Sequence, residues 1–211
     1  MSDDEIRVSY DTVAKNYAEV NDRLGPIDRA MLGVAVELSD GPIADVGCGP
    51  GRTTSYLASL GADAYGVDLS PGMVEVARGL WPGIRFEIGS MRALDAPDAA
   101  LGGIVAFYSI IHIATEELPL VFAEFARVLR AGGPVLLAFQ LGAGEERDEK
   151  VHVDSGYGHT VSVDLWRRQP ELVVELLGAA GFAHLSTSIR EPEGTEKTRQ
   201  AHVLVRRGPR P

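Results

Sequence analysis

Hydrophobic residues fall in short runs along the chain, and segments with a helical period of apolar positions separate these runs. The runs are short enough for strands, and the one at 103–110 is apolar almost throughout, which suits a strand covered on both faces. Alternation of this kind predicts repeated βαβ units, hence a parallel sheet wrapped by helices with right-handed crossovers. Strands are predicted at 43–47, 63–68, 84–88, 103–110 and 135–139.

Helices are predicted between these strands from their capping residues and apolar spacing. Ser70 is the expected N-cap of a helix that begins at Pro71, because proline at the first helical position loses no hydrogen bond. Thr115 is expected to cap a later helix whose apolar residues recur on one face. The three predicted helices are 52–60, 71–79 and 115–129.

The pattern changes after Gln140. A polar loop is predicted at 141–150, an exposed strand at 159–166 and a helix at 170–181. Two further strands at 184–191 and 200–207 are joined by a turn-rich stretch, so they are expected to form an antiparallel edge of the sheet.

The first forty residues are predicted to be helical and to pack over the carboxyl edge of the sheet, where open α/β folds bind ligands. Two apolar stripes support the helices: Val13, Ala14, Tyr17 and Val20 in the first, and Met31, Val34 and Leu38 in the second.

Composition narrows the class of protein. The 211 residues carry a formal charge of −10, which disfavours nucleic acid and anionic membrane surfaces as partners. Cys48 is the single cysteine, so no intramolecular disulfide forms, and the acidic start does not resemble a signal peptide. These features favour one soluble cytoplasmic domain, and they leave the oligomeric state open.

The stretch "IADVGCGPGRTT" (43–54) places Gly47, Gly49 and Gly51 between a strand and a helix. Glycines there permit a tight turn and let a ligand approach the main chain. Their spacing differs from the dinucleotide fingerprint, and Asp45 would repel a pyrophosphate. Asp68 ends the second strand, where a carboxylate accepts hydrogen bonds from ribose hydroxyls. Adenosine with a cationic end fits this pattern, and S-adenosylmethionine is such a ligand.

With these motifs the sequence resembles class I S-adenosylmethionine-dependent methyltransferases, of the small bacterial type (methyltransferase type 11/25-like). The matching stretches run in family order over residues 8–206 and are "IADVGCGPGRTT", "YGVDLSPGMVEVAR", "FEIGSMRAL", "GIVAFYSIIHI" and "FARVLRAGGPVLLAF". The resemblance implies a Rossmann-like three-layer α/β/α sandwich, with a mostly parallel seven-stranded sheet and an antiparallel last strand. It implies a single domain made of a helical lid (1–40), a cofactor-binding core (41–140), a substrate-side insertion (141–168), and a C-terminal helix with edge strands (169–211).

The resemblance also implies cofactor-binding roles. The three loop glycines would line the methionine part of the cofactor, Asp45 would hold its ammonium group directly or through water, and Asp68 would hold the ribose. Many family members carry aspartate where this chain has Ser90. The remaining expected contacts are Leu69 and Met73 beside the adenine, Ser90 and Met91 at its polar edge, Phe107 and Tyr108 near the methyl group, and Tyr10 and Tyr17 from the lid. Phe107 and Tyr108 are equally well explained as core aromatics.

On the acceptor side, His112 is the candidate general base and a substrate contact, because it follows the fourth strand at the edge where the methyl group must lie. A structural role at the next helix is the alternative. Tyr157, His159 and Trp166 are candidate substrate contacts in the insertion. His152, His159 and Asp154 do not match a metal-binding spacing, and no metal is predicted.

The predicted function is therefore transfer of a methyl group to an O, N or C atom of a small-molecule acceptor, with S-adenosyl-L-homocysteine as the second product. Two alternatives stay open: methylation of a protein or RNA, and a non-methylating protein that keeps the cofactor site. The acidic charge argues against RNA.

Overall fold

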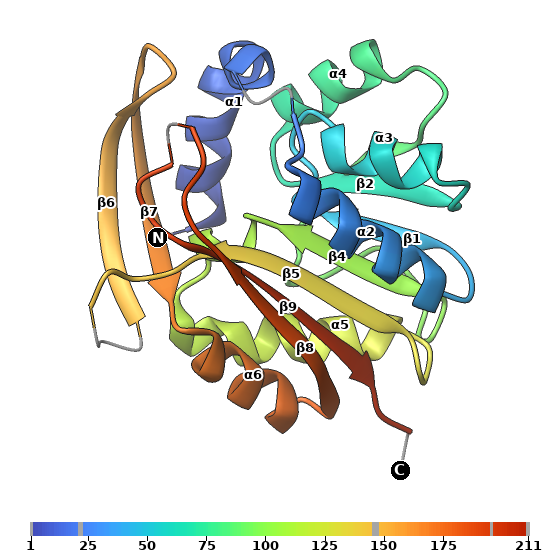
Figure 1. Cartoon of the computed structure of the whole chain (residues 1–211). Coiled ribbons are helices and arrows are strands. Elements are labelled where there is room, and N and C mark those ends of the chain that lie inside the picture. The colour runs from blue at the N-terminus through green and yellow to red at the C-terminus, as the bar shows by residue number, and fades with distance from the viewer. Residues whose placement is uncertain (1, 21–22, 145–147, 195, 210–211) are drawn as a thin grey trace.

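A twisted sheet of seven strands forms the centre of the molecule (Figure 1). The computed structural model describes residues 2–20, 23–144, 148–194 and 196–209. The strand order is β3-β2-β1-β4-β5-β9-β8, and only β9 runs against its neighbours. The predicted sheet with an antiparallel last strand is thus confirmed. The strands are β1 (Ile43–Val46), β2 (Ala64–Asp68), β3 (Phe86–Ile88), β4 (Gly103–Phe107), β5 (Pro134–Gln140), β8 (Phe182–Arg190) and β9 (Gln200–Arg207).

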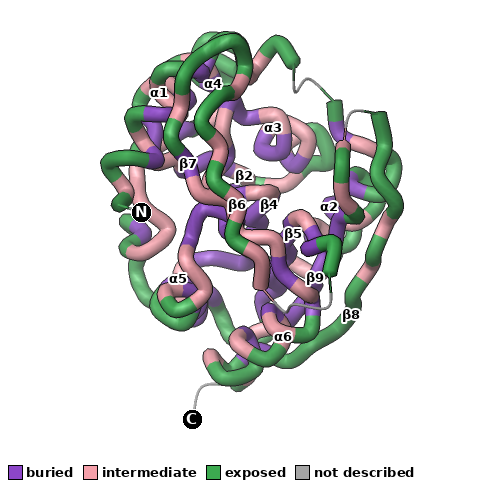
Figure 2. Tube along the Cα trace, turned by 90° about the vertical axis from the view of Figure 1, so that its left-hand side faces the viewer, coloured by how far each residue is buried: buried purple, intermediate pink, exposed green. Residues whose placement is uncertain are grey.

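Helices cover both faces of this sheet, and β4 shows why its sequence is apolar throughout. Ile104 and Ala106 face the cluster that α5 (Leu118–Val128) and α6 (Pro170–Ala179) complete. Val105 and Phe107 face the opposite cluster, with α2 (Pro26–Leu38) and α3 (Arg52–Ser59). Because successive side chains point to opposite faces, a strand with both faces covered has no polar positions. The tube view shows these central strands as the most buried part of the chain (Figure 2).

Two further helices lie at the β3 side and above the carboxyl edge. Ser70 caps α4 (Pro71–Leu80) as predicted, because its hydroxyl accepts a hydrogen bond from the Met73 amide at 3.0 Å. The first helix, α1 (Asp3–Val20), packs Val13 and Ala14 against Met73 of α4. Its other side meets a separate two-stranded sheet, through a 3.1 Å hydrogen bond from the Ser9 hydroxyl to the Ser162 carbonyl.

That second sheet is an antiparallel hairpin of β6 (Asp148–Gly156) and β7 (His159–Arg168) that stands beside α1 (Figure 1). The predicted loop at 141–150 is therefore wrong at its end, where β6 begins. Val151 pairs with Leu165 and Val153 with Val163, so alternate apolar residues face one side. Val151 and Val153 are the only large apolar residues of β6, so the alternation is too short to indicate a strand from the sequence. Residues 145–147 of the predicted loop lie outside the described residues.

The end of β4 and the start of α5 differ from the predictions for local reasons. β4 ends at Phe107 because Tyr108 has a positive φ of 55°, and 3₁₀ turns follow at Ile110–His112 and Thr115–Glu117. Thr115 does not cap α5; its hydroxyl oxygen instead accepts a hydrogen bond from Arg168.

The second helix also departs from its predicted position and stripe. α2 lies on a face of the sheet, not over the carboxyl edge, and it buries Leu32 and Ala35. Val34 is 42% exposed, and in α1 Val20 is 68% exposed. The predicted stripe of α1 therefore contains one residue too many. The predicted stripe of α2 is wrong in its centre, because the helix buries Leu32 and Ala35 where Val34 was expected.

None of the helices in the described part of the chain is long and apolar enough to span a membrane.

A fully buried arginine ties the hairpin to the main sheet. Arg168 ends β7 and donates to the Ile110 carbonyl at 3.0 Å, to the Ile113 carbonyl, and to the Thr115 hydroxyl at 2.8 Å. Burial lowers the pKa of its guanidinium to about 10, so it stays charged at neutral pH. Arg168 therefore fixes the turn that carries His112.

Replacing this arginine should destabilise the fold. Arg168→Met leaves two carbonyls and a hydroxyl without their donor, so the free energy of unfolding is expected to fall by about 3–5 kcal/mol. Urea denaturation measures the change, and Arg199→Met, at an exposed arginine, is the control with an expected change below about 0.5 kcal/mol. Equal stability of the two variants would contradict this role.

Candidate functional site

The turn between β1 and α3 is held in a shape that glycine permits. Gly47 has a φ of 75°, and a Cβ there would lie 2.2 Å from the Ser109 Cβ. Ser109 in turn donates from its hydroxyl to the Val46 carbonyl at 2.7 Å. Gly49 has a φ of 54°, and the nearest atom to a Cβ there is in Tyr17, 4.0 Å away. The first glycine thus lets the ends of β1 and β4 approach, and the second leaves space above the turn.

Asp68, at the end of β2, is anchored by the backbone on both sides. Its Oδ2 accepts from the Gly49 amide at 2.7 Å, and its Oδ1 accepts from the Ser70 amide at 2.9 Å. Burial raises the pKa of Asp68, and the two amide hydrogen bonds oppose that shift. Each carboxylate oxygen keeps a second lone pair, so the group can still accept hydrogen bonds from hydroxyls.

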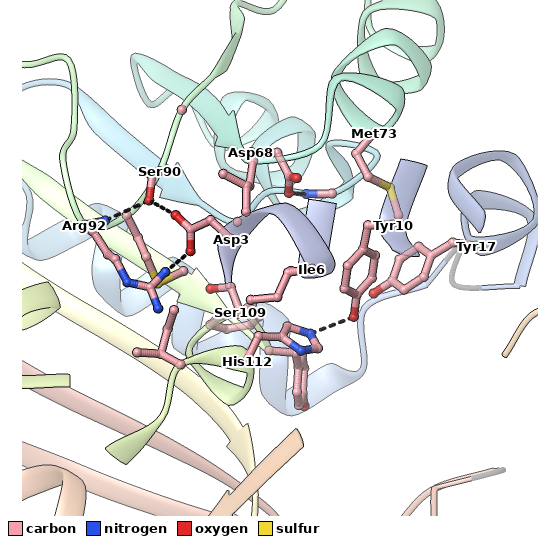
Figure 3. A pocket seen from close by; sticks show the side chains of 18 residues that line it. Asp3, Ile6, Tyr10, Tyr17, Asp68, Met73, Ser90, Arg92, Ser109 and His112 are labelled. Atoms are coloured by element: carbon pink, nitrogen blue, oxygen red, sulfur yellow. Dashed lines mark hydrogen bonds and ion pairs between the residues drawn. The ribbon is translucent and has the colours of Figure 1, made fainter. Parts of the chain in front are cut away.

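A cavity opens at the carboxyl ends of β1, β2 and β4, with α1 as its roof (Figure 3). The empty space of this cavity, including its open mouth, is about 680 Å³. Most residues predicted to bind the cofactor meet here: Tyr10, Tyr17, Gly47, Gly49, Asp68, Leu69, Met73, Ser90, Met91, Phe107 and Tyr108.

Two predicted residues lie beneath the cavity without lining it. A Cβ on Gly51 would lie 2.6 Å from the Phe86 ring, so this glycine serves packing. Asp45 is buried, and its Oδ2 accepts from the Thr54 hydroxyl at 2.7 Å. Its Oδ1 is buried with no hydrogen-bond partner among the described residues, and burial raises the pKa of this carboxyl to about 7. Asp45 is therefore poised between its charged and neutral forms near neutral pH.

The roof helix adds polar residues that the sequence analysis did not identify. Asp3 accepts from the Ser90 hydroxyl at 2.9 Å and forms an ion pair with Arg92, which also contacts Glu117 at 2.9 Å (Figure 3). The carboxylate beside Ser90 thus comes from α1. No local motif reveals it, because the pair is 87 residues apart in the chain.

His112 lines the cavity and is hydrogen-bonded through both ring nitrogens. Its Nε2 lies 2.6 Å from the Tyr10 hydroxyl, and its Nδ1 lies 3.3 Å from the Asp164 carbonyl (Figure 3). Since a carbonyl only accepts, Nδ1 carries the hydrogen and Nε2 accepts from Tyr10. Burial lowers the pKa of His112 to about 4, so the ring is neutral at physiological pH.

The predicted acceptor-side residues of the hairpin lie in different places. Tyr157 lines a pocket that adjoins the cavity, and its ring centroid lies 4.9 Å from that of Tyr17. His159 is exposed at the start of β7, and Trp166 packs beside Lys150; neither lines the cavity or the adjoining pocket.

His152 contacts Asp164 at 2.9 Å. Within the described residues, no group of three His, Cys, Asp or Glu side chains converges as a metal site.

Strand order and cavity together define a class. The order of the parallel strands reverses between β1 and β4, and the cavity lies at this switch point beside the carboxylate that ends β2. This is the arrangement of Rossmann-like nucleotide-binding proteins. Residues 43–133 match the family model described as "Methyltransferase domain". These matches support a class I, S-adenosylmethionine-dependent methyltransferase of the type 11/25 kind.

Known proteins resemble the chain over much of this region. Malonyl-[acyl-carrier protein] O-methyltransferase of Serratia marcescens is 32% identical over 130 residues, which are 62% of this chain and 48% of that protein. Trans-aconitate 2-methyltransferase of Rhizobium meliloti is 34% identical over 142 residues, 66% of this chain and 52% of that protein. The matches thus span about half the length of these curated relatives.

Solved structures share the fold. The 1,6-didemethyltoxoflavin-N1-methyltransferase of Burkholderia thailandensis, crystallised with its acceptor and S-adenosylhomocysteine, superposes with a TM-score of 0.75 at 18% identity. The superposition covers 98% of this chain and 88% of that protein. At this level of identity the likeness concerns the fold.

The raised pKa of Asp45 predicts a pH-dependent stability for the protein without ligand. Between the ordinary pKa of 3.8 and about 7, the folded state binds more protons than the unfolded state, so the free energy of unfolding decreases as pH rises through this window. Asp45→Asn removes that dependence and should be more stable than the wild type at pH 8, by about 2–4 kcal/mol, and similar to it at pH 4.

Urea denaturation from pH 4 to 8 measures the difference. Asp63→Asn, at an exposed carboxylate, should follow the wild-type curve. Parallel curves for wild type and Asp45→Asn would show that Asp45 ionises normally.

Proposed function

We propose that this protein transfers a methyl group from S-adenosylmethionine to an O, N or C atom of a small-molecule acceptor. The observation that carries the proposal is the position of Asp68: its carboxylate lines the cavity beside a glycine turn, and amides of both flanking turns hold it in place. A carboxylate at the end of this strand accepts hydrogen bonds from ribose hydroxyls. The relatives, named for malonyl-[acyl-carrier protein] and trans-aconitate, support methyl transfer.

The residues present fit this cofactor. Gly49 leaves open space above the turn for the methionine part, Asp68 accepts from the ribose, and Met73 and Leu69 provide apolar walls for the adenine. Asp3 and Ser90 supply an acceptor and a hydroxyl at its polar edge. Asp45 lies below the turn, and a cationic ligand would favour its ionised form.

When bound, S-adenosylmethionine supplies a methyl group to which the acceptor lone pair forms the new bond, while the electrons of the broken C–S bond return to sulfur. The protein has to align the acceptor with the methyl group and exclude water. Alignment of this kind lowers the barrier by about 7–11 kcal/mol. Tyr10, Tyr17 and Tyr108 are placed for it, because they line both the cavity and the adjoining pocket.

His112 is the candidate base for acceptors that lose a proton. In its present hydrogen bonding the Nε2 lone pair faces the Tyr10 hydroxyl, so the proton would pass from the acceptor to Tyr10 as the Tyr10 proton passes to His112. For an acceptor that is already ionised, no proton has to be removed, and the hydrogen bond from Tyr10 to His112 only positions the Tyr10 ring.

Removing the Asp68 carboxylate should weaken cofactor binding. Asp68→Ala loses the ribose contact and the anchor of two amides, so the Kd for S-adenosylhomocysteine is expected to rise by tenfold or more, about 1.4 kcal/mol. Calorimetry measures this, and circular dichroism checks that the variant is folded. Asp63→Ala, an exposed carboxylate before β2, should bind like the wild type.

The activity itself is tested by release of S-adenosylhomocysteine during turnover with a panel of acceptors. A wild-type protein that binds neither S-adenosylmethionine nor S-adenosylhomocysteine would refute the proposal. Binding without turnover for the whole panel would point to a non-methylating protein.

The proton route predicts coupled losses at two residues. For a protonated acceptor, His112→Gln and Tyr10→Phe are each expected to lower kcat by about 100-fold, and the double variant by little more than either. Because His112 titrates near pH 4, neither wild type nor variant should show an inflection from it between pH 6 and 9. His184→Gln, at an exposed histidine in β8, is the control. A kcat for His112→Gln within about threefold of wild type would leave this histidine a packing role.

A further inference from the structure

A second pocket adjoins the cofactor cavity. It shares Tyr10, Tyr17 and Tyr108 with the cavity and encloses about 2060 Å³, its open mouth included. Its walls come from the connection between α1 and α2, the end of β7, and the loop between β8 and β9. A molecule in this pocket would meet the cofactor cavity at the three shared tyrosines.

The charge of this pocket is opposite to that of the whole chain. The described residues that line it include six cationic side chains and three acidic ones, whereas the chain has a formal charge of −10. The cations are Arg23, Arg29, Arg52, Arg167, Arg190 and Lys197. In an acidic protein, such a concentration in one concave surface focuses a positive potential there.

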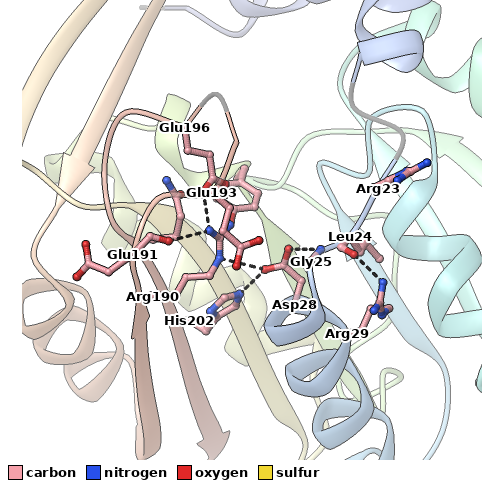
Figure 4. A network of polar contacts seen from close by, with 12 residues as sticks. Arg23, Leu24, Gly25, Asp28, Arg29, Arg190, Glu191, Glu193, Glu196 and His202 are labelled. Carbon is pink, nitrogen blue, oxygen red and sulfur yellow. Dashed lines mark hydrogen bonds and ion pairs between the residues drawn. The ribbon is translucent and has the colours of Figure 1, made fainter.

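Two of the three acids are already engaged by other side chains (Figure 4). Glu196 forms a two-point ion pair with Arg190, at 2.5 and 2.6 Å. Asp28 accepts from His202 at 2.8 Å and from the Gly25 amide at 3.0 Å, and it lies 3.9 Å from Arg190. Arg190 is therefore neutralised within the fold, and it in turn donates to the Tyr108 hydroxyl at 3.3 Å.

The guanidinium of Arg167 has hydrogen-bonding capacity that the fold does not use. Its nearest carboxylate, Glu149, is 3.7 Å away, beyond hydrogen-bond distance. Its Nε is buried and has no hydrogen-bond partner in the part of the chain that the structure describes. Arg29 donates to the Leu24 carbonyl at 2.9 Å, and a contact with a carbonyl leaves the net charge of a guanidinium in place.

We infer that the methyl acceptor is an anionic small molecule, whose carboxylate or phosphate group is held by Arg167 in this pocket while its reacting atom lies between Tyr10 and Tyr108. The inference rests on the proposed function and adds the class of substrate. A guanidinium matches carboxylates and phosphates with two parallel hydrogen bonds, which gives orientation as well as affinity. The transfer step is unchanged: the acceptor lone pair bonds the methyl carbon, and sulfur keeps the electrons of the C–S bond.

The test is an NMR titration of the protein loaded with S-adenosylhomocysteine, because NMR detects millimolar binding. The probes are succinate, 4-hydroxybenzoate and phenyl phosphate, each beside its uncharged counterpart: succinamide, 4-hydroxybenzamide and phenol. At least one anion should bind tenfold or more tightly than its counterpart, and its affinity should fall as salt is raised.

The matched variants are Arg167→Gln and Arg85→Gln. The first keeps a polar side chain of similar length without the charge, and should weaken the bound anion tenfold or more while the Kd for S-adenosylhomocysteine stays within twofold. The second removes a charge whose side chain is 61% exposed, beyond β2 and away from this pocket, and should change neither affinity.

Three outcomes would overturn the inference: anions that bind no better than their counterparts, no anion that binds, or an Arg167→Gln variant with unchanged anion affinity. Each of these outcomes is measured on protein that has S-adenosylhomocysteine bound. A protein that fails to bind S-adenosylhomocysteine refutes the proposed function instead, so the two failures are distinguishable.

Discussion

The carboxylate of Asp68 joins two turns of the chain that the rest of the cavity depends on. It accepts the Gly49 amide from the turn after β1 and the Ser70 amide from the turn after β2. Because both oxygens are used, the two turns have one relative position, and the start of α4 is fixed with them. Ser109 joins β4 to β1 in a similar way, because its hydroxyl, just after the end of β4, donates a hydrogen bond to the Val46 carbonyl. The floor of the cavity is thus fixed by three strand ends.

The roof helix α1 is also held by a small number of polar contacts. Asp11 of α1 accepts from the Ser70 hydroxyl at 2.6 Å and from the Gly72 amide at 2.9 Å, so the roof helix supplies a cap to α4. At the first residue of α1, Asp3 contacts Ser90 and Arg92. On the far side Ser9 binds Ser162 of the hairpin. α1 is thereby placed by polar contacts to the core and to the hairpin, and its tyrosines face the space between them.

Local patterns were sufficient for the sheet and for most of the cavity floor. Glycines between an apolar strand and a helix, an aspartate at the end of the next strand, and a Ser-Pro cap each have a physical reason that is visible in a few consecutive residues. β6 was missed because only Val151 and Val153 alternate in it, and Thr115 was misread because a distant arginine donates to its hydroxyl. Asp3, Ser109 and Arg167 acquire their roles only when segments far apart in the chain approach, so no local pattern could assign them.

Tyr108 stands where the two pockets meet, and its backbone lies in the left-handed region with a φ of 55°. For a residue with a Cβ this conformation costs of order 1 kcal/mol or more, and asparagine and glycine adopt it most readily. Reshaping the protein for a bulkier acceptor is therefore asymmetric. On the hairpin side Tyr157 shares this restriction with a φ of 53°, whereas Leu165 is not among the residues with a positive φ and accepts a wider choice of side chains. At Tyr108 the main chain itself restricts which side chains an engineer or evolution can install.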